Sequence, residues 1–227
     1  MSENKIMNVV AKDALKYVQD GMVLGLGSGR AAAVLVRNLG EKISKENICI
    51  QGVPTSLQIK LIAEEVGIKM IEPGEISKID IVFDGADQID ESKYYLVKGG
   101  GGALLRENIL ANMAEQVIIM ADDTKFVKDI HGPIPIEIHS AARNFVINHI
   151  KKNNGTPQIR KQERGYPIFT ENGNIILDCD FGVIQEPLDL SADLRQVPGI
   201  LEVGIFNKPD IIYNVSKNKF SKILIKK

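Results

Sequence analysis

Short apolar runs alternate with stretches of helical periodicity over the first 130 residues, and this alternation constrains the fold more than any other feature of the chain. Strands are predicted at residues 22–26, 48–53, 68–71, 81–83 and 117–120, and helices at residues 3–19, 31–39, 57–66 and 103–113. Such alternation is typical of βαβ units with a parallel sheet. Ligands of open α/β sheets bind outside the carboxyl ends of the strands, so the loops that follow the strands are the candidate sites.

The pattern changes after residue 130. Strands are predicted at 134–138, 158–162, 174–179 and 201–206, and helices at 141–150 and 188–195. This βαββαβ order is the ferredoxin-like pattern. We therefore expect a Rossmann-like parallel-sheet domain, residues 1–130 and 207–227, and a second, smaller ferredoxin-like α+β domain, residues 131–206. The last apolar runs, 211–215 and 223–225, fit either domain, and we assign them to the first.

Composition excludes several classes of function. The chain carries 28 basic and 29 acidic residues, which argues against a broad nucleic-acid surface. No stretch approaches the ~20 apolar residues of a membrane span, and the N-terminus does not resemble a signal peptide. Cys49 and Cys179 are isolated in apolar segments, which favours reduced core thiols over a disulfide framework. We expect a cytoplasmic protein that binds neither nucleic acid nor membrane.

A glycine-rich segment, GLGSGRAA, joins the first predicted strand to a helix; we call it the first glycine loop, residues 25–32. Glycines allow the backbone to approach a ligand, and the helix N-terminus favours anions. Ser28 and Arg30 add donors suited to phosphate. A tight turn without a ligand is the alternative. The segment also fits a dinucleotide fingerprint, but the strand at 48–53 ends without the acid that such a site requires. Thr55 and Ser56 follow that strand, either as a helix cap or as ligand contacts.

Two carboxylates, Asp84 and Asp87, flank Gly85-Ala86 directly after a buried strand. They suit sugar hydroxyls or proton transfer, or else an Asx-turn and a helix cap. With Asp90 and Glu91 nearby, a divalent-metal patch is conceivable. The three histidines have no metal-ligand spacing, which excludes a zinc site.

A lysine, Lys98, precedes four consecutive glycines; we call residues 98–102 the second glycine loop. Backbone N–H groups beside an ammonium suit an anionic or enolate oxygen, although most lysines are simply solvated. Glu107 lies early in the helix that follows. It is either a general base or a first-turn glutamate that complements the helix dipole.

Five motifs in this order, GLGSGRAA, VPTS, DGADQID, KGGGGALLREN and ADDTK, resemble those of ribose-5-phosphate isomerases of the A type. The second half resembles the same family at residues 135–138, 170–178 and 198–206, so the likeness covers nearly the whole chain. It implies a Rossmann-like domain plus a ferredoxin-like domain. It also implies the interconversion of ribose 5-phosphate and ribulose 5-phosphate in the non-oxidative pentose phosphate pathway, with no metal and no cofactor.

The resemblance also implies roles for individual residues. Glu107 takes the place of the base that moves a proton between C1 and C2, and Lys98 with the following amides stabilises the enediolate. Asp84 and Asp87 hold sugar hydroxyls and assist ring opening. The first loop departs from the family's G-S-T-A, because Arg30 and Ala31 stand there and a threonine hydroxyl is missing. The substrate-binding positions are Gly27, Ser28, Gly29, Arg30, Ala31, Asp84, Gly85, Ala86, Asp87, Lys98, Gly99, Gly100, Gly101 and Lys125.

Two other functions compete with an isomerase. A phosphosugar-binding sensor on the same fold needs the phosphate loop but neither Glu107 nor Lys98. A nicotinamide-dependent dehydrogenase is opposed by the missing acid after the strand at 48–53. For the isomerase, the expected partner is a small sugar phosphate, and the expected assembly is a homodimer or homotetramer.

Overall fold

The computed structural model describes residues 3–217 and 219–225, which form two compact units. Unit 1 comprises Met1–Ala86, Arg106–Lys125 and Pro209–Lys227, and unit 2 comprises Asp87–Leu105 and Phe126–Lys208. Residues 87–105, 126–130 and 207–208, which we expected in the first domain, fall in unit 2. The expected domain boundaries otherwise remain a prediction, and residues 1–2, 218 and 226–227 lie outside the described part of the chain.

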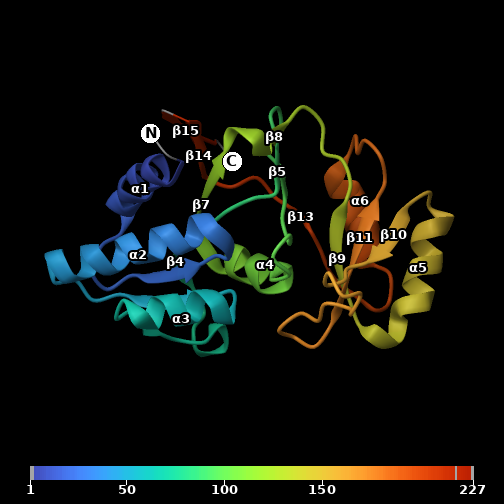
Figure 1. Cartoon of the computed structure of the whole chain (residues 1–227), viewed down its shortest axis with the longest axis horizontal. Coiled ribbons are helices and arrows are strands. Elements are labelled where there is room, and N and C mark those ends of the chain that lie inside the picture. The colour runs from blue at the N-terminus through green and yellow to red at the C-terminus, as the bar shows by residue number, and fades with distance from the viewer. Residues whose placement is uncertain (1–2, 218, 226–227) are drawn as a thin grey trace. The chain divides into compact units, whose positions relative to one another are not determined.

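A seven-stranded sheet forms the centre of unit 1, with strand order β15-β14-β7-β4-β1-β2-β3. Figure 1 labels four of these strands, β15, β14, β7 and β4. All neighbouring pairs are parallel except β14 and β15. The strands are β1 (Val23–Leu26), β2 (Gln51–Pro54), β3 (Lys69–Met70), β4 (Ile79–Asp84), β7 (Ala114–Asp122), β14 (Ile211–Val215) and β15 (Phe220–Leu224). The helices are α1 (Glu3–Ala14), η1 (Leu15–Tyr17), α2 (Gly29–Glu46), α3 (Leu57–Glu65), η2 (Pro73–Glu75) and η3 (Asp123–Lys125).

The sheet of unit 1 is covered on both faces. Helices α1, α2 and α3 pack in one hydrophobic cluster with Ile81 and Phe83 of β4. Helix α4 (Leu104–Met113), which begins at the end of unit 2 and continues in unit 1, packs through Leu110 in a second cluster with Val82. Successive side chains of a strand point to opposite faces, so these clusters cover the two faces. The Cβ of any residue other than glycine at position 25 would clash with Val82 beneath α4.

A four-stranded antiparallel sheet, order β10-β11-β9-β12, lies in unit 2. Its elements follow the predicted βαββαβ order: β9 (Ile134–Ile138), η4 (Ser140–Ala142), α5 (Arg143–Lys152), β10 (Thr156–Ile159), β11 (Ile175–Asp180), α6 (Pro187–Arg195) and β12 (Ile200–Val203). Residues of α5 and α6 pack together with Ile134, Ile136 and Ile138 of β9, so both helices cover one face. The predicted fold class, a parallel α/β sheet with a smaller ferredoxin-like α+β part, is confirmed.

A second small sheet of unit 2 was not predicted. It has the order β13-β6-β5-β8 and consists of β5 (Gln88–Asp90), β6 (Leu96–Val97), β8 (Phe126–Val127) and β13 (Ile205–Phe206). The single strand expected at 201–206 therefore divides between two sheets at Gly204. The reason is a close backbone approach: the Gly204 N–H donates to the Pro135 carbonyl (2.7 Å), and a Cβ there would clash with the Lys98 carbonyl.

Two other expectations can be compared with the structure. Cys179 is buried in β11, and burial raises the pKa of its thiol well above the ordinary range. Cys49 is exposed, so the expectation of a core thiol there was wrong, because β2 begins only at Gln51.

Within the described residues, no helix combines the length and apolarity needed to cross a membrane.

Candidate active site

All candidate residues of unit 1 except Glu107 follow three adjacent strands of its sheet. In the order β7-β4-β1, the first glycine loop follows β1, Asp84 ends β4, and Lys125 comes three residues after β7. The strands are parallel, so all three carboxyl ends lie at the same edge. The chain leaves β1 for β2 on one side, whereas β4 lies on the other side. The pair β1 and β4 is therefore the topological switch point, where open α/β sheets bind ligands.

Gly27 and Asp84 fit together at this switch point. The Gly27 N–H donates to the Phe83 carbonyl (2.8 Å), which extends the pairing of β1 with β4 by one residue. Only a hydrogen atom fits on the Gly27 Cα, because an added Cβ would overlap the Asp84 carboxyl group. Asp84 is 2% exposed, and its Oδ1 accepts the N–H groups of Ser28 (3.2 Å) and Gly85 (2.8 Å). The Asp84 carboxylate is thus held rigidly at the strand end.

Ser28 connects this strand end to Glu107. The Ser28 hydroxyl donates to Glu107 Oε1 at 2.5 Å, across 79 residues of sequence. Glu107 lies in the first turn of α4 and is 3% exposed. Ser28 occupies the N-cap position of α2, yet its side chain makes no capping bond. Its hydroxyl therefore orients a buried carboxylate, and this carboxylate is the one expected to act as the base.

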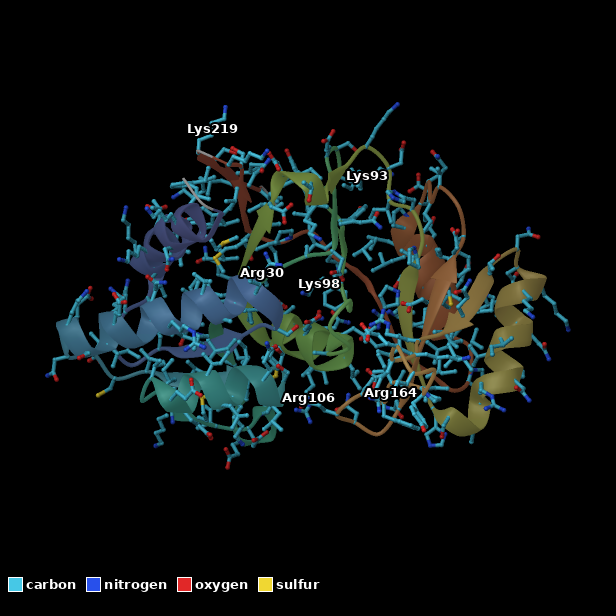
Figure 2. All side chains as sticks on the ribbon, in the orientation of Figure 1. Arg30, Lys93, Lys98, Arg106, Arg164 and Lys219 are labelled. Carbon is cyan, nitrogen blue, oxygen red and sulfur yellow. The ribbon has the colours of Figure 1, made fainter. Side chains whose placement is uncertain are left out.

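The first turn of α2 presents a potential anion site. Gly29 begins this 18-residue helix with a φ of 81°, which favours glycine, and Ala31 carries no polar side chain. Arg30 is exposed at the N-terminal end of the helix (Figure 2). Lys125, at the end of η3, is partly buried. The unsatisfied N–H groups and the dipole of a helix N-terminus favour a negatively charged group.

The remaining candidates, Asp87, Lys98 and the second glycine loop, belong to unit 2. Asp87 is exposed, and its Oδ2 accepts the Gly100 N–H at 2.7 Å. An alanine Cβ at position 100 would lie 2.6 Å from Asp87 Oδ1. Gly99 and Gly102 have positive φ angles, of 102° and 82°, so this turn requires glycine. The loop thus brings its backbone next to the Asp87 carboxylate.

Lys98 is buried, with 5% of its surface exposed. Its N–H donates to the Gly204 carbonyl (2.9 Å), and its Nζ lies 5.8 Å from the centre of the Phe206 ring. Gly204, directly before β13, and Phe206, within β13, therefore position the backbone and the ammonium group of Lys98. A buried ammonium interacts with an anionic oxygen more strongly than a solvated one does.

A buried polar cluster supports the face of the four-stranded sheet opposite its helices. Glu137 of β9 is fully buried, and its Oε1 accepts hydrogen bonds from Thr170 (2.8 Å), Asn172 (3.1 Å) and Asn174 (2.8 Å). Two of the family-like motifs, residues 135–138 and 170–178, thus meet here. No pattern in the sequence indicates what joins them.

The roles of Thr55 and Ser56, which the sequence left open, are structural in the observed contacts. Ser56 caps α3, since its hydroxyl accepts the Ile59 N–H (3.4 Å). Thr55 is 1% exposed, and both its N–H and its hydroxyl donate to the Leu26 carbonyl at 3.0 Å.

Asp90, which the sequence placed in a conceivable metal patch, makes structural contacts as well. Burial alone would raise the pKa of Asp90, but hydrogen bonds from Lys93 and Ser92 lower it. In the described residues, no three His, Cys, Asp or Glu side chains are grouped to hold a metal ion.

Comparison with known proteins agrees with this geometry. The family model for ribose 5-phosphate isomerase A (phosphoriboisomerase A) matches residues 51–218. Ribose-5-phosphate isomerase A of Methanocaldococcus jannaschii is 38% identical over 214 residues, which cover 92% of this chain and 93% of that protein. Its homologue from Archaeoglobus fulgidus is 39% identical over 201 residues, covering 87% and 88%.

Solved structures give the same result. The structure of the Methanocaldococcus jannaschii enzyme has a TM-score of 0.93 at 35% identity and covers 99% of this chain and all of that one. A D-ribose-5-phosphate isomerase in complex with phospho-erythronic acid has the same TM-score, identity and coverage. With the switch-point carboxylates, the two glycine loops and the matched sequence considered together, the chain belongs to the ribose 5-phosphate isomerase A family.

Proposed function

We propose that this protein interconverts D-ribose 5-phosphate and D-ribulose 5-phosphate through an enediolate, with Glu107 as the base. The observation that carries the proposal is the buried Glu107 carboxylate, oriented by the Ser28 hydroxyl at the switch point of the sheet. The name of every relative reported above supports the same reaction. The partner is accordingly a small sugar phosphate.

The proposed chemistry requires one carboxylate that serves two adjacent carbons. In the open-chain aldose, Glu107 removes the proton from C2, the C–H electron pair forms the C1–C2 double bond, and the π pair of the C1 carbonyl moves to the C1 oxygen, which becomes the negative oxygen of the enediolate. The proton of the C2 hydroxyl then passes to the C1 oxygen, so the negative charge moves to the C2 oxygen. As this oxygen forms the C2 ketone, the C1–C2 π pair takes the proton back from Glu107 at C1. General base catalysis of this kind contributes roughly 10²–10⁴-fold. Lys98 and the amides of Gly99 and Gly101 stabilise the negative oxygen, while the Gly100 amide holds the Asp87 carboxylate at the substrate.

The other expected residues bind the substrate in this proposal. Asp84 and Asp87 accept hydrogen bonds from sugar hydroxyls and assist ring opening, while Gly85 and Ala86 place the backbone between them. The phosphate binds at the N-terminus of α2, where Arg30 supplies positive charge, with Lys125 as a second cation. Support comes from the exposed Gly29 and Arg30 at the start of this long helix, at the carboxyl edge of the sheet.

Ser28 has two expected tasks that compete. A hydroxyl has one proton, so it does not donate to Glu107 and to a phosphate at the same time. The 2.5 Å contact favours the orientation of Glu107. We therefore assign the phosphate to Arg30 and to the backbone N–H groups of the first turn, and the orientation of Glu107 to the Ser28 hydroxyl.

The cellular setting is also a proposal. The reaction belongs to the non-oxidative pentose phosphate pathway, which places the protein in the cytoplasm. We expect a homodimer or homotetramer that does not bind nucleic acid, since the charge of the chain is balanced at 28 basic and 29 acidic residues.

A turnover assay tests the proposed function. Ribulose 5-phosphate formation from ribose 5-phosphate is followed by absorbance, without added cofactor and with a chelator present, and we expect undiminished turnover. Glu107→Gln keeps the shape of the side chain and removes its basicity, so kcat should fall at least tenfold, which corresponds to ~1.4 kcal/mol of barrier. Binding of ribose 5-phosphate to the wild type without any turnover would instead identify a phosphosugar sensor.

A further inference from the structure

We propose that Arg160, which follows β10, is a positioning residue that orients the amide N–H groups of Gly100 and Gly101 in the second glycine loop. Its guanidinium Nη1 donates to the carbonyl oxygens of Gly99 (2.7 Å) and Gly100 (3.0 Å). The inference that this contact serves catalysis rests on the proposed function. All of these residues lie in unit 2.

The guanidinium is itself held firmly. Its Nε donates to Asp178 Oδ2 (2.9 Å), and its Nη2 pairs with Asp178 Oδ1, which makes a two-pronged ion pair. The Arg160 N–H donates to the Ile176 carbonyl (2.9 Å), and its own carbonyl accepts the Ile168 N–H (3.0 Å). Only 14% of the Arg160 side chain is exposed. Four of its five N–H donors are thus used, two on Asp178 and two on the loop.

Peptide geometry transmits this contact to the amide groups. The carbonyl of Gly99 and the N–H of Gly100 belong to one planar peptide unit and point in opposite directions, and the same holds for the Gly100 carbonyl and the Gly101 N–H. Fixing the two carbonyls therefore fixes the direction of the two N–H groups. A cation at the carbonyl end also polarises the peptide, which strengthens its N–H as a donor.

The loop needs such an anchor because four successive glycines have little conformational preference of their own. The Gly100 N–H donates to Asp87 Oδ2 (2.7 Å), so the direction of this amide also sets the position of the Asp87 carboxylate. Arg160 thereby acts on two groups expected at the substrate, the loop amides and Asp87. It does so through the backbone, without touching the substrate.

The first measurement is amide hydrogen exchange, which does not depend on enzymatic activity. In Arg160→Gln, exchange at the amides of residues 98–102 should rise at least tenfold, with the α5 and α6 amides unchanged. The matched control is Arg195→Gln. Arg195 also pairs with a carboxylate in unit 2, that of Glu202, but its hydrogen bonds go to Ser191 and Val203 rather than to the loop. Unchanged loop exchange in Arg160→Gln, or an equal rise in Arg195→Gln, would overturn the inference.

The second measurement separates positioning from structural support. In Arg160→Gln, kcat for ribose 5-phosphate should fall at least tenfold with KM changed less than threefold, and Arg195→Gln should keep the wild-type kcat. Arg160→Lys preserves the charge but not the fork, so it should not restore kcat. Wild-type kcat in Arg160→Lys, or equal losses of kcat in Arg160→Gln and Arg195→Gln, would contradict a positioning role for Arg160.

Two outcomes need separate treatment. If Arg160→Gln does not fold, Asp178→Asn tests the same anchor, because it weakens the ion pair that holds the guanidinium. A smaller rise in loop amide exchange and a smaller fall in kcat would support the inference. Unchanged exchange and unchanged kcat would contradict it. If the wild type does not turn over ribose 5-phosphate, the proposed function fails. Hydrogen exchange then decides alone whether Arg160 positions the loop.

Discussion

The contact between Ser28 and Glu107 leads to a prediction with a defined magnitude. Ser28→Ala removes the hydroxyl that donates to Glu107 Oε1 at 2.5 Å. The backbone at Ser28 is extended (φ −103°, ψ 169°), and the side chain does not cap α2, so alanine fits without strain or loss of a cap. The variant should therefore fold normally, and the change is confined to the orientation of one buried carboxylate.

The expected loss follows from the strength of that bond. A hydrogen bond to a charged group contributes about 1.5–3 kcal/mol. If this energy holds Glu107 in its reactive orientation, its loss should lower kcat by about 10- to 150-fold, since each 1.36 kcal/mol corresponds to a factor of ten. KM should change little, because the proposed phosphate contacts are left intact. Ser56→Ala, at the N-cap of α3, is the matched control and should lower the melting temperature with kcat unchanged.

Absorbance-monitored kinetics with ribose 5-phosphate distinguish the two tasks considered for Ser28. A raised KM with an unchanged kcat would indicate uniform binding of substrate and transition state. The hydroxyl would then serve the phosphate, as the family resemblance implies, and the reasoning from the 2.5 Å contact would be refuted.

Two further predictions concern the charge at α2 and the stability of unit 1. Arg30→Ala should lower kcat/KM for ribose 5-phosphate by an amount equivalent to about 1.5–3 kcal/mol and should leave the slow turnover of unphosphorylated ribose unchanged; equal losses on both sugars would show that Arg30 supports the loop instead. The Lys16 and Tyr213 side chains hydrogen-bond to Asp13 and lower its pKa, so this stabilisation is complete above the ordinary carboxyl pKa near 4 and is lost as the pH falls through the lower folded-state value. Tyr213→Phe should therefore lower the free energy of unfolding by about 1–2 kcal/mol at pH 7 and by less at pH 3, as measured by urea unfolding; an equal loss at both pH values would exclude the Asp13 charge as the cause.

The elements that the sequence predicted well are those whose apolar spacing is strong. Helix α2 illustrates both success and failure. Ala32, Leu35, Val36 and Leu39 reveal the helix. After Leu39, Ile43 is the only apolar side chain of residues 40–46, and the pairs Lys42–Glu46 and Lys45–Glu41 stabilise these last turns. The prediction therefore ended at residue 39, whereas the helix continues to Glu46.

The missed features depend on contacts between distant residues. Strands β6, β8 and β13 have two residues each, too few for any periodicity to show. The candidate carboxylates were visible because they lie in short motifs that contain glycines, DGAD and KGGGGALLREN. The partners of the candidate residues were not visible in the sequence. Ser28 contacts Glu107 across 79 residues of sequence, and Arg160 contacts Gly99 across 61. A lone arginine after a strand carries no signal of such a partner.

The order of strands in unit 1 also has a consequence for synthesis on the ribosome. Strand β7 lies between β4 and β14, and β14 pairs with it along five residues, from Ile211 opposite Ile118 to Val215 opposite Asp122. The nascent chain supplies β14 only after the whole four-stranded sheet of unit 2 has been made. Until then the nine-residue strand β7 has one open edge, and open edges are templates for pairing with other chains. Synthesis of residues 211–215 thus closes an edge that the growing polypeptide otherwise leaves open to pairing with other chains.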